Sequence, residues 1–329
     1  MGIAADPPIA LAMPTYQSER YVSEAIASVL AQTRADFRLW VVDDGSTDTT
    51  VEQVRRTVGS DRRVRVVRLG TRHGMIAAWR VSAVRALAGR PRWFAWVADH
   101  DLLEPQWLEA LASCMTDRPD AVLAWPLTDR IDSDSRPIGE TAEEWTTDGL
   151  APRERASAAI WSIRGAGDMV YGLFDARSLV EAGIFRRFLL PDLLLVAEVA
   201  LMGHVVQVPE VLRHRRVFPT PSLPRQRETL FSEALPKPWW TRRLPARFTH
   251  RCFLAARLAF APPPTLTVPR SDAAEVAAAA AALTAARWLR DLPSVVARRI
   301  DHGLRSASRG ASRGVTRWFA PAVGESRPL

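Results

Sequence analysis

Short, mostly apolar runs alternate with helix-like segments through the first 125 residues of the chain. The runs show no helical repeat, which is typical of strands buried on both faces. The segments between them place apolar residues three and four positions apart, as amphipathic helices do. Such alternation favours right-handed crossovers and a mostly parallel sheet flanked by helices, an α/β fold. The predicted strands are 9–13, 39–42, 64–69, 93–98 and 121–125.

Beyond residue 125 the pattern is less regular, and it changes again after residue 216. The polar stretch 129–153 predicts irregular structure. Further expected elements are helices at 153–163, 176–182, 192–202 and 272–290 and strands at 168–174 and 205–208.

The distribution of charged residues separates the first part of the chain from the last part more clearly than the hydrophobic pattern does. The 329 residues carry a net charge of +8, yet the part from Val211 onward holds about 21 Lys and Arg against about 7 acids. Prolines punctuate the same part. We therefore predict one domain over 1–216, a basic, proline-punctuated helical extension over 217–304, and a disordered tail rich in Ser, Gly and Arg over 305–329.

The buried run that starts at Trp93 ends in two carboxylates, Asp99 and Asp101. In an extended chain their side chains point the same way, because the side-chain period of a strand is two. Like charges this close are unfavourable unless a cation or several donors lie between them. Hard oxygen ligands suit Mg²⁺ or Mn²⁺. A solvated turn after the strand is the plain alternative.

Two further polar loops follow predicted strands, Pro14–Arg20 after the first and Asp43–Asp48 after the second. The carboxyl ends of parallel strands meet at one edge of a sheet, where open α/β folds bind ligands. Neither a Gly-x-Gly-x-x-Gly loop nor a P-loop is present, so the sequence lacks the phosphate cradle of dinucleotide-binding and P-loop proteins. Two cysteines give neither a disulfide framework nor a zinc pattern.

These motifs, taken in order, resemble the family 2 glycosyltransferases of the GT-A fold. The likeness rests on the loop starting at Pro14, the Val41–Asp48 turn, the Asp99-His100-Asp101 motif and a second-half pattern ending at Val208–Leu212, and it covers about residues 7–216. It implies transfer of a sugar from a UDP-, GDP- or dTDP-sugar to a glycan, lipid-linked or small-molecule acceptor.

The resemblance also assigns roles to individual positions. It implies nucleotide-sugar contacts, metal ligands and a catalytic base, where the base is an acidic residue at the start of a helix in the second half. The nucleotide-sugar contacts would be Thr15, Tyr16, Glu19, Asp43, Asp44 and Asp99, the ligands of Mn²⁺ or Mg²⁺ would be Asp101 and Asp99, and the base would be Asp192.

Each role has a physical rationale. A metal ion neutralises the departing diphosphate as a Lewis acid, and a carboxylate within about 3 Å of the acceptor hydroxyl removes its proton. One base without a protein nucleophile implies inversion at the anomeric carbon. Asp192 alternatively serves only as a helix cap. The competing functions are a non-catalytic sugar-nucleotide-binding or scaffold protein, and a nucleotidyltransferase, which lacks support because its Gly-rich first loop is missing.

The basic, aromatic stretch 239–258 has two interpretations, contact with anionic lipid and docking on the catalytic domain. No nucleic-acid recognition motif accompanies it, so we expect no nucleic-acid partner. Arg215 and Arg216 either reach a diphosphate or form a basic surface turn. The first residues lack a basic n-region, which predicts no signal peptide. We expect a cytoplasmic protein, with the inner face of the plasma membrane as its candidate surface.

Overall fold

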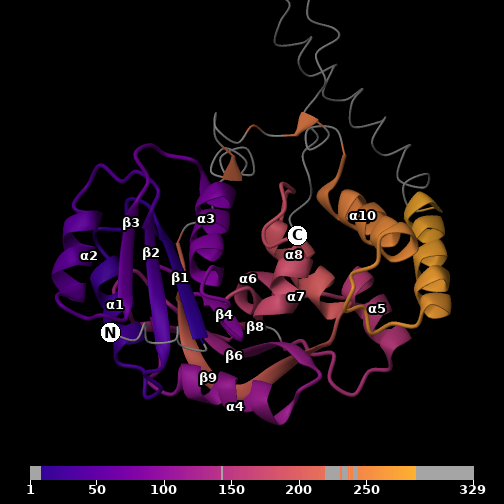
Figure 1. The fold of residues 1–329 in the computed structure, drawn as a ribbon, viewed down its shortest axis with the longest axis horizontal. Helices are drawn as coiled ribbons and strands as arrows, with labels where there is room; N and C mark the ends of the chain where they lie inside the picture. The colour runs from indigo at the N-terminus through magenta and orange to yellow at the C-terminus, as the bar shows by residue number, and fades with distance from the viewer. Residues whose placement is uncertain are drawn as a thin grey trace, which may run out of the picture.

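In a computed structural model of the chain, residues 9–141, 144–218, 230–231, 236, 238–239 and 244–286 are described. Nine strands within these ranges form a single sheet (Figure 1). The predicted tail over 305–329 and much of the predicted extension lie outside the described residues. The strands are β1 (Ile9–Thr15), β2 (Phe37–Asp43), β3 (Val64–Arg68), β4 (Trp93–Trp96), β5 (Leu102–Leu103), β6 (Ala121–Ile131), β7 (Pro137–Thr141), β8 (Leu173–Asp175) and β9 (His204–Arg216).

The strand order β3-β2-β1-β4-β8-β6-β9-β5 confirms the α/β class and refines the expected pairing. The first four strands are mutually parallel, as predicted. β8 runs antiparallel to both β4 and β6, and β5 and β7 pair antiparallel with β9 and β6. The second half of the sheet is therefore mixed, while β6 and β9 are parallel to each other.

Helices cover both faces of this sheet (Figure 1). One face carries α3, α5, α6, α7, α8 and α10, and the other carries α1, α2 and α4. Residues 270–286 are also helical. The helix bounds are α1 (Val22–Leu30), α2 (Thr50–Val58), α3 (Met75–Leu87), α4 (Trp107–Asp117), α5 (Pro152–Trp161), α6 (Ala166–Met169), α7 (Ala176–Glu181), α8 (Pro191–Ala200) and α10 (Ala246–Phe260).

The central strands divide the core into two layers by their period of two. In β4, Phe94 and Trp96 face the layer under α3 and α8, whereas Trp93 and Ala95 face the layer under α1 and α4. All four side chains are buried. A strand buried on both faces needs apolar residues at every position, which is why β4 reads as an unbroken apolar run.

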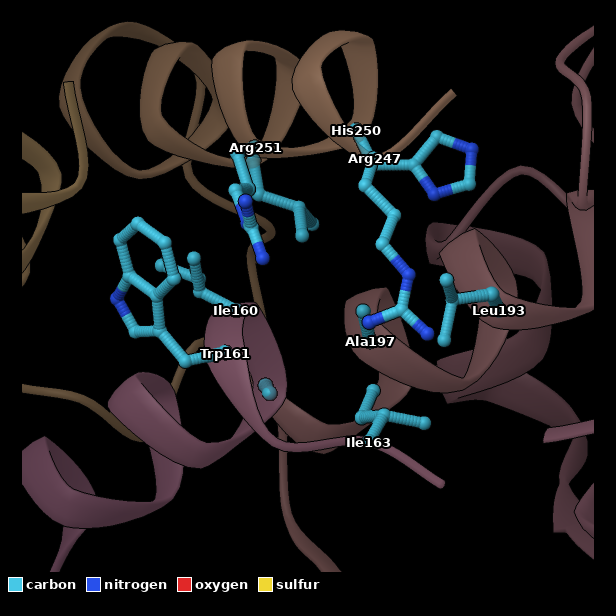
Figure 2. Close-up of a pocket in the computed structure, with 10 residues that line it drawn as sticks. Ile160, Trp161, Ile163, Leu193, Ala197, Arg247, His250 and Arg251 are labelled. Carbon is cyan, nitrogen blue, oxygen red and sulfur yellow. The ribbon is translucent and has the colours of Figure 1, made fainter. Parts of the chain in front are cut away.

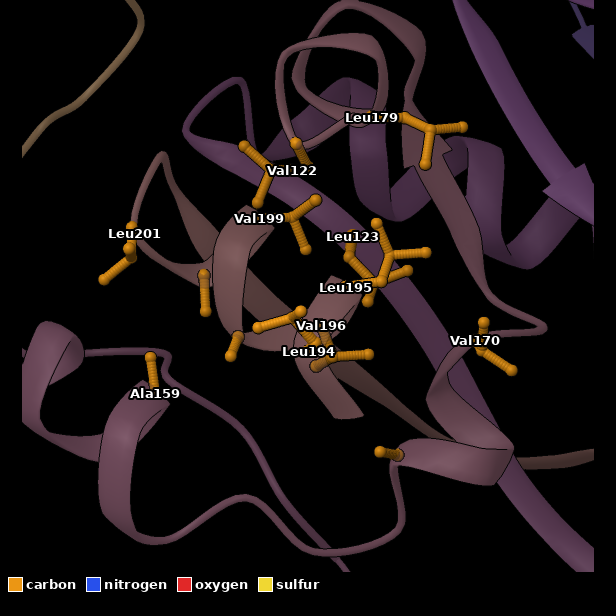
Figure 3. Close-up of a cluster of buried hydrophobic side chains, with 14 of the residues drawn as sticks. Val122, Leu123, Ala159, Val170, Leu179, Leu194, Leu195, Val196, Val199 and Leu201 are labelled. Carbon is orange, nitrogen blue, oxygen red and sulfur yellow. The ribbon is translucent and has the colours of Figure 1, made fainter. Parts of the chain in front are cut away.

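Helix α8 is the most completely enclosed helix of the site-bearing half. Its own side chains are buried around the whole helix, including Leu194, Leu195, Val196 and Val199. Figure 3 shows these side chains between β6 and the small helices of the second half, with Leu123 of β6 pointing at them. An all-round apolar helix is held in place by packing, so its amino end is a fixed point from which a polar side chain can act.

Two sequence expectations for the second half are wrong. The strand predicted at 168–174 is instead the short helix α6 followed by β8, because Gly165, with φ 66°, turns the chain into a helical turn before the strand. The stretch 129–153 is not irregular throughout, since β6 continues to Ile131 and pairs with β7. β7 pairs only with β6 and lies off the main strand order, at a margin of the sheet where polar residues are tolerated.

The predicted strand at 205–208 also extends much further, to Arg216 in β9. Pro209 does not end it, because the register with β6 shifts at this point: Pro126 pairs with Val208 and Leu127 with Val211. The proline falls in a bulge, where its missing N–H is not needed by the ladder. This extension carries four basic residues, Arg213 to Arg216, to the site described below.

Helix α10 belongs to the predicted extension and packs on the catalytic half. Phe253 contacts the ring of Phe188 at a centroid distance of 5.2 Å, and Leu254 and Leu258 are buried. The docking interpretation of 239–258 is thus confirmed for its described part. Within the described ranges, no helix combines the length and apolar character that crossing a bilayer requires.

The contact between β8 and β6 requires glycine at position 172. A Cβ there would lie 2.4 Å from the carbonyl oxygen of Ala124, so we expect Gly172→Ala to lower the free energy of unfolding by about 1–3 kcal/mol or more. Gly70→Ala is the matched control, because a Cβ there meets nothing within 4 Å; it should change stability by less than about 1 kcal/mol. Urea unfolding measures both, and equal values would contradict this packing.

Candidate active site

The three loops predicted to share an edge do meet at the carboxyl ends of β1, β2 and β4. The N–H of Asp44 donates to the carbonyl oxygen of Thr15 at 2.8 Å. The hydroxyl of Ser18 donates to the carbonyl oxygen of Asp99 at 3.0 Å, and the N–H of Tyr16 lies 3.4 Å from Asp99 Oδ2. The predicted juxtaposition is confirmed, and hydrogen bonds between the loops fix it.

Thr15 and Tyr16 present two different surfaces at this edge. Thr15 is buried, and its hydroxyl has no hydrogen-bond partner within the described part of the chain. Tyr16 is 40% exposed, and the guanidinium of Arg72 lies 4.7 Å from its ring centroid. An exposed ring partnered by a cation offers a planar platform of the kind on which a nucleotide base stacks.

Asp43 and Asp44 are buried; Asp43 holds its own loop in shape, and Asp44 ties that loop to the segment before α3. The Asp43 carboxylate accepts the N–H of Ser46 at 3.1 and 3.2 Å. Asp44 accepts the N–H groups of His73 and Gly74 at 2.7 and 2.9 Å, just before α3, although burial raises the pKa of its carboxyl. Their predicted contacts with a nucleotide stay predictions.

Glu19 lies on the exposed rim of the same edge. Its Oε2 accepts the N–H and the hydroxyl of Thr49 at 3.0 and 2.7 Å. The side chain therefore ties the first loop to the start of α2. Its predicted contact with a nucleotide sugar also stays a prediction.

Asp99 and Asp101 lie close together, as predicted, but in different environments. Asp99 is buried with 12% of its side chain exposed, and its Oδ1 lies 2.7 Å from Nδ1 of His100. Asp101 is buried, and both of its oxygens are engaged: Nη2 of Arg213 lies 2.5 Å from Oδ2, and the N–H of Arg216 donates to Oδ1 at 2.9 Å. Burial alone would raise the pKa of Asp101, but the charges of Arg213 and His100 and the hydrogen bonds from Arg213 and Arg216 together hold the pKa below its usual value.

Arg213 extends this contact into a buried ionic network. Its Nη1 lies 3.2 Å from Oδ1 of Asp168, and its guanidinium stacks 4.1 Å from the ring centroid of Tyr171. Arg130 and Arg215 also bind Asp168, at 2.7 and 3.2 Å. Burial opposes ionisation of Asp168, but the charges of Arg213 and Arg215 lower its pKa.

Neither periodicity nor motifs in the sequence point to Asp168, Arg130 or Arg213, because the pattern predicts a strand at Asp168 and an end of the last strand before Arg213. One signal was available: Arg213 and Arg215 are two residues apart, so an extended chain places them on the same side. Arg216, singled out with Arg215, is not a surface residue, because its buried guanidinium binds Glu24 and the carbonyl of His100.

Asp192 lies in the first turn of α8, two residues after Leu190, whose backbone is left-handed with φ 51°. A bulky residue in this conformation is strained, and such strain gathers at functional sites. Burial raises the pKa of the Asp192 carboxyl, while the N–H of Leu193 and the charge of Arg215 act in the opposite direction. The raised pKa makes this carboxylate a better proton acceptor than an ordinary aspartate.

A cavity of about 360 Å³ opens beside Asp192. Asp192 Oδ2 and Arg215 Nη1 both lie within 3.6 Å of the point that a Cβ would occupy at Gly167. The network from Asp101 through Arg213 and Asp168 therefore ends at the cavity. Its lining consists of Arg130, Ile163, Arg164, Gly165, Ala166, Gly167, Asp168, Leu190, Asp192, Leu193, Arg215 and Arg247.

The predicted metal ligands fit that role unequally. Asp101 has no oxygen left for a cation while Arg213 and the Arg216 N–H hold it. Asp99 fits better, since more of its side chain is exposed, 12% against 2% for Asp101. Among the described residues no group of three or more His, Cys, Asp or Glu forms a metal cluster. Mg²⁺ often takes only one or two carboxylates and completes its shell with substrate phosphates and water.

Comparison with known proteins agrees with this geometry. Residues 10–166 match the family model described as Glycosyl transferase family 2. This match covers just under half of the chain and supports a family 2 glycosyltransferase. The matched region contains Asp99 and Asp101, whereas Asp192 and Arg215 lie beyond it.

Curated relatives match this chain over short stretches. A protein of Haemophilus influenzae described as an uncharacterized glycosyltransferase is 34% identical over 80 residues, 24% of this chain and 32% of the relative. The chondroitin synthase of Pasteurella multocida is 30% identical over 103 residues, 31% of this chain and 10% of the synthase. The matched stretches thus span a third or less of these relatives.

Solved structures show the same fold over more of the chain. TarS of S. aureus in complex with UDP has a TM-score of 0.54 at 15% identity, covering 82% of this chain and 69% of the TarS chain. A second TarS structure, in complex with UDP-GlcNAc, gives the same score and identity. At this identity the likeness shows the fold, which is the GT-A arrangement expected from the sequence motifs.

The buried pair of Asp101 and Arg213 should contribute strongly to stability. Asp101→Asn leaves Arg213 without its full countercharge, so we expect a loss of about 3–5 kcal/mol in the free energy of unfolding at pH 7. Asp134→Asn is the control: it removes an exposed ion pair with Arg20 and should cost about 1 kcal/mol or less.

The same pair predicts that the free energy of unfolding depends on pH. Because the pKa of Asp101 is lowered by folding, its contribution is complete above the unfolded value of about 4 and disappears as pH falls through the folded value. The gap between wild type and Asp101→Asn in urea unfolding should therefore narrow at acidic pH. A gap that is absent at pH 7 would contradict the buried network.

Proposed function

We propose that this protein transfers a sugar from a nucleotide-diphosphate donor to an acceptor hydroxyl. The observation that carries the proposal is the position of Asp192, a carboxylate of raised pKa that lines a cavity next to Arg215. A buried ionic network connects that cavity with the loop edge that contains Asp99. The donor would thus bind at the loop edge and the acceptor in the cavity, and the buried ionic network would hold these two sites at a fixed distance.

The loop edge is the proposed donor site. Tyr16 offers an exposed ring, and Thr15, Glu19, Asp43 and Asp44 supply oxygens at the same edge. The match of residues 10–166 to the family 2 model and the likeness to TarS, solved in complex with UDP and with UDP-GlcNAc, support a nucleotide-sugar donor. A uridine nucleotide is the first donor to test, with GDP- and dTDP-sugars as the alternatives.

Asp99 is the proposed ligand for Mn²⁺ or Mg²⁺, shared with the donor diphosphate. When bound there, the cation would supply Lewis-acid stabilisation of the leaving group. Asp101 acts differently in this proposal: bound to Arg213 and to the Arg216 N–H, it fixes β9 against the loop that carries Asp99. This assigns binding to one carboxylate and positioning to the other.

Asp192 is the proposed general base. Its carboxylate takes the proton of the acceptor hydroxyl, the hydroxyl oxygen forms a bond to the anomeric carbon, and the bond from that carbon to the diphosphate oxygen breaks. Attack comes from the face opposite the leaving group, which inverts the anomeric configuration. An NMR assignment showing a retained configuration in the product would overturn this part of the proposal.

Donor binding can be tested by thermal denaturation. UDP in hundredfold excess over its Kd should stabilise the protein by about 2.7 kcal/mol, and Mn²⁺ should enlarge the shift. Asp99→Asn should remove the metal-dependent part, whereas Asp36→Asn, at an exposed site before β2, should keep it. If none of UDP, GDP or dTDP raises the Tm, the donor site is wrong.

The base can be tested by turnover and its pH profile. Asp192→Asn should lower kcat for sugar release from the donor, to water or to an added acceptor, by about 10²–10⁴-fold and leave UDP affinity nearly unchanged. Asp175→Asn, which removes a carboxylate that only caps α7, should keep normal turnover. Because burial raises the pKa of Asp192, the acid limb of kcat/KM should lie above the ordinary aspartate value of 3.8; a limb at or below it contradicts the assignment.

A further inference from the structure

The cavity beside Asp192 is strongly basic for an acceptor site. Four arginines line it, Arg130, Arg164, Arg215 and Arg247, against the two carboxylates of Asp168 and Asp192. Asp168 is already shared between arginines, and Arg130 is committed to it through two hydrogen bonds at 2.7 and 3.1 Å. Positive charge therefore remains in excess on the other side of the cavity.

Three of these arginines have donors to spare. Arg164 and Arg247 are exposed, and no ion pair involves either of them within the described ranges. Arg215 uses Nη1 for Asp168, and its side chain is 41% exposed. Guanidinium groups bind phosphate and carboxylate oxygens through paired N–H donors. Several arginines around one space suit a phosphate, which offers more oxygens and more charge than a carboxylate.

Arg247 reaches the cavity from the C-terminal extension. Figure 2 shows its side chain leaving α10 and passing between Leu193 of α8 and Ile163. These three residues line both this cavity and a smaller one of about 20 Å³ under α10. The helix is held by other contacts, since Nε2–H of His250 donates to the carbonyl of Leu189 at 2.7 Å. Arg247 is therefore presented to the cavity without being needed for docking.

Gly167 keeps the centre of the cavity open. A side chain there would occupy the space between Arg215 and Asp192, which both face that point. An anion bound by Arg215 and a hydroxyl bound by Asp192 would then be separated by only a few bonds. A volume of about 360 Å³ is within the range of small-molecule sites.

We propose that this cavity binds an acceptor that carries a phosphate close to the hydroxyl that receives the sugar, with Arg164, Arg215 and Arg247 binding the phosphate. The inference rests on the proposed function, because it takes Asp192 as the base for that hydroxyl. It adds the class of the acceptor, a phosphorylated polyol or sugar, and assigns a specificity role to α10.

Calorimetric titration of the full chain with sn-glycerol 3-phosphate tests the proposal. The titration is run with and without saturating UDP and Mn²⁺, beside glycerol and glycerate. We expect glycerol 3-phosphate to bind in both conditions, glycerate at least about tenfold more weakly, and glycerol not measurably. Arg247→Gln should weaken binding about tenfold, with partial recovery in Arg247→Lys, while Arg177→Gln, a comparably exposed arginine on α7, should bind normally.

Other outcomes are equally informative. If UDP abolishes glycerol 3-phosphate binding, the arginines serve the donor diphosphate and the proposal is overturned; equal binding of glycerate, or no effect of Arg247→Gln, also overturns it. Failure of UDP to bind, with glycerol 3-phosphate still bound, would instead refute the proposed function and leave a phosphate site.

The source of the phosphate is resolved by vesicle sedimentation. Phosphatidylglycerol vesicles should retain the protein more than phosphatidylcholine vesicles if the acceptor is a lipid headgroup, and glycerol 3-phosphate should compete for that binding. Sedimentation that is equal for the two lipids, together with binding of glycerol 3-phosphate, identifies a soluble acceptor.

Discussion

Arg213 is the residue on which the rest of the candidate site depends. It is buried between Asp101 at the end of the central strand and Asp168 in α6, and it stacks on Tyr171. A buried cation is tolerated only when opposite charges and hydrogen bonds compensate its lost hydration. Here two carboxylates and an aromatic ring do so, and in return the guanidinium fixes the distance between the loop edge and the cavity.

This arrangement changes what an Asp-x-Asp motif means in this chain. Spacing of two places both carboxylates on one side of the chain, yet Asp99 is the more exposed of the two, with 12% of its side chain accessible against 2% for Asp101. Asp101 is closed by groups from β9, more than 110 residues later in the sequence. One aspartate thus remains available for binding, and its neighbour holds the sheet together at the point where binding takes place.

Helix α10 of the C-terminal extension contributes to the candidate acceptor site. Helix α10 covers α8, and its His250 supports the backbone of Leu189 just before Asp192. Its Arg247 enters the cavity lining. The basic segment 239–258 has the composition of a membrane contact. Its described part also lines the candidate acceptor site, through Arg247.

The amino-acid sequence by itself determined the α/β class, the first four parallel strands and the meeting of three loops at one edge, because those features follow from local periodicity and from the polarity of short motifs. Its motifs also resemble those of family 2 glycosyltransferases, and this resemblance nominated Asp192. Only the tertiary structure decided the course of β9 through a bulge at Pro209, the pairing of Asp101 with Arg213, and the presence of Asp168 and Arg247 at the cavity. These depend on contacts between residues far apart in the chain, and the free energy of a buried charge is set by the partners that folding brings to it rather than by its neighbours in sequence.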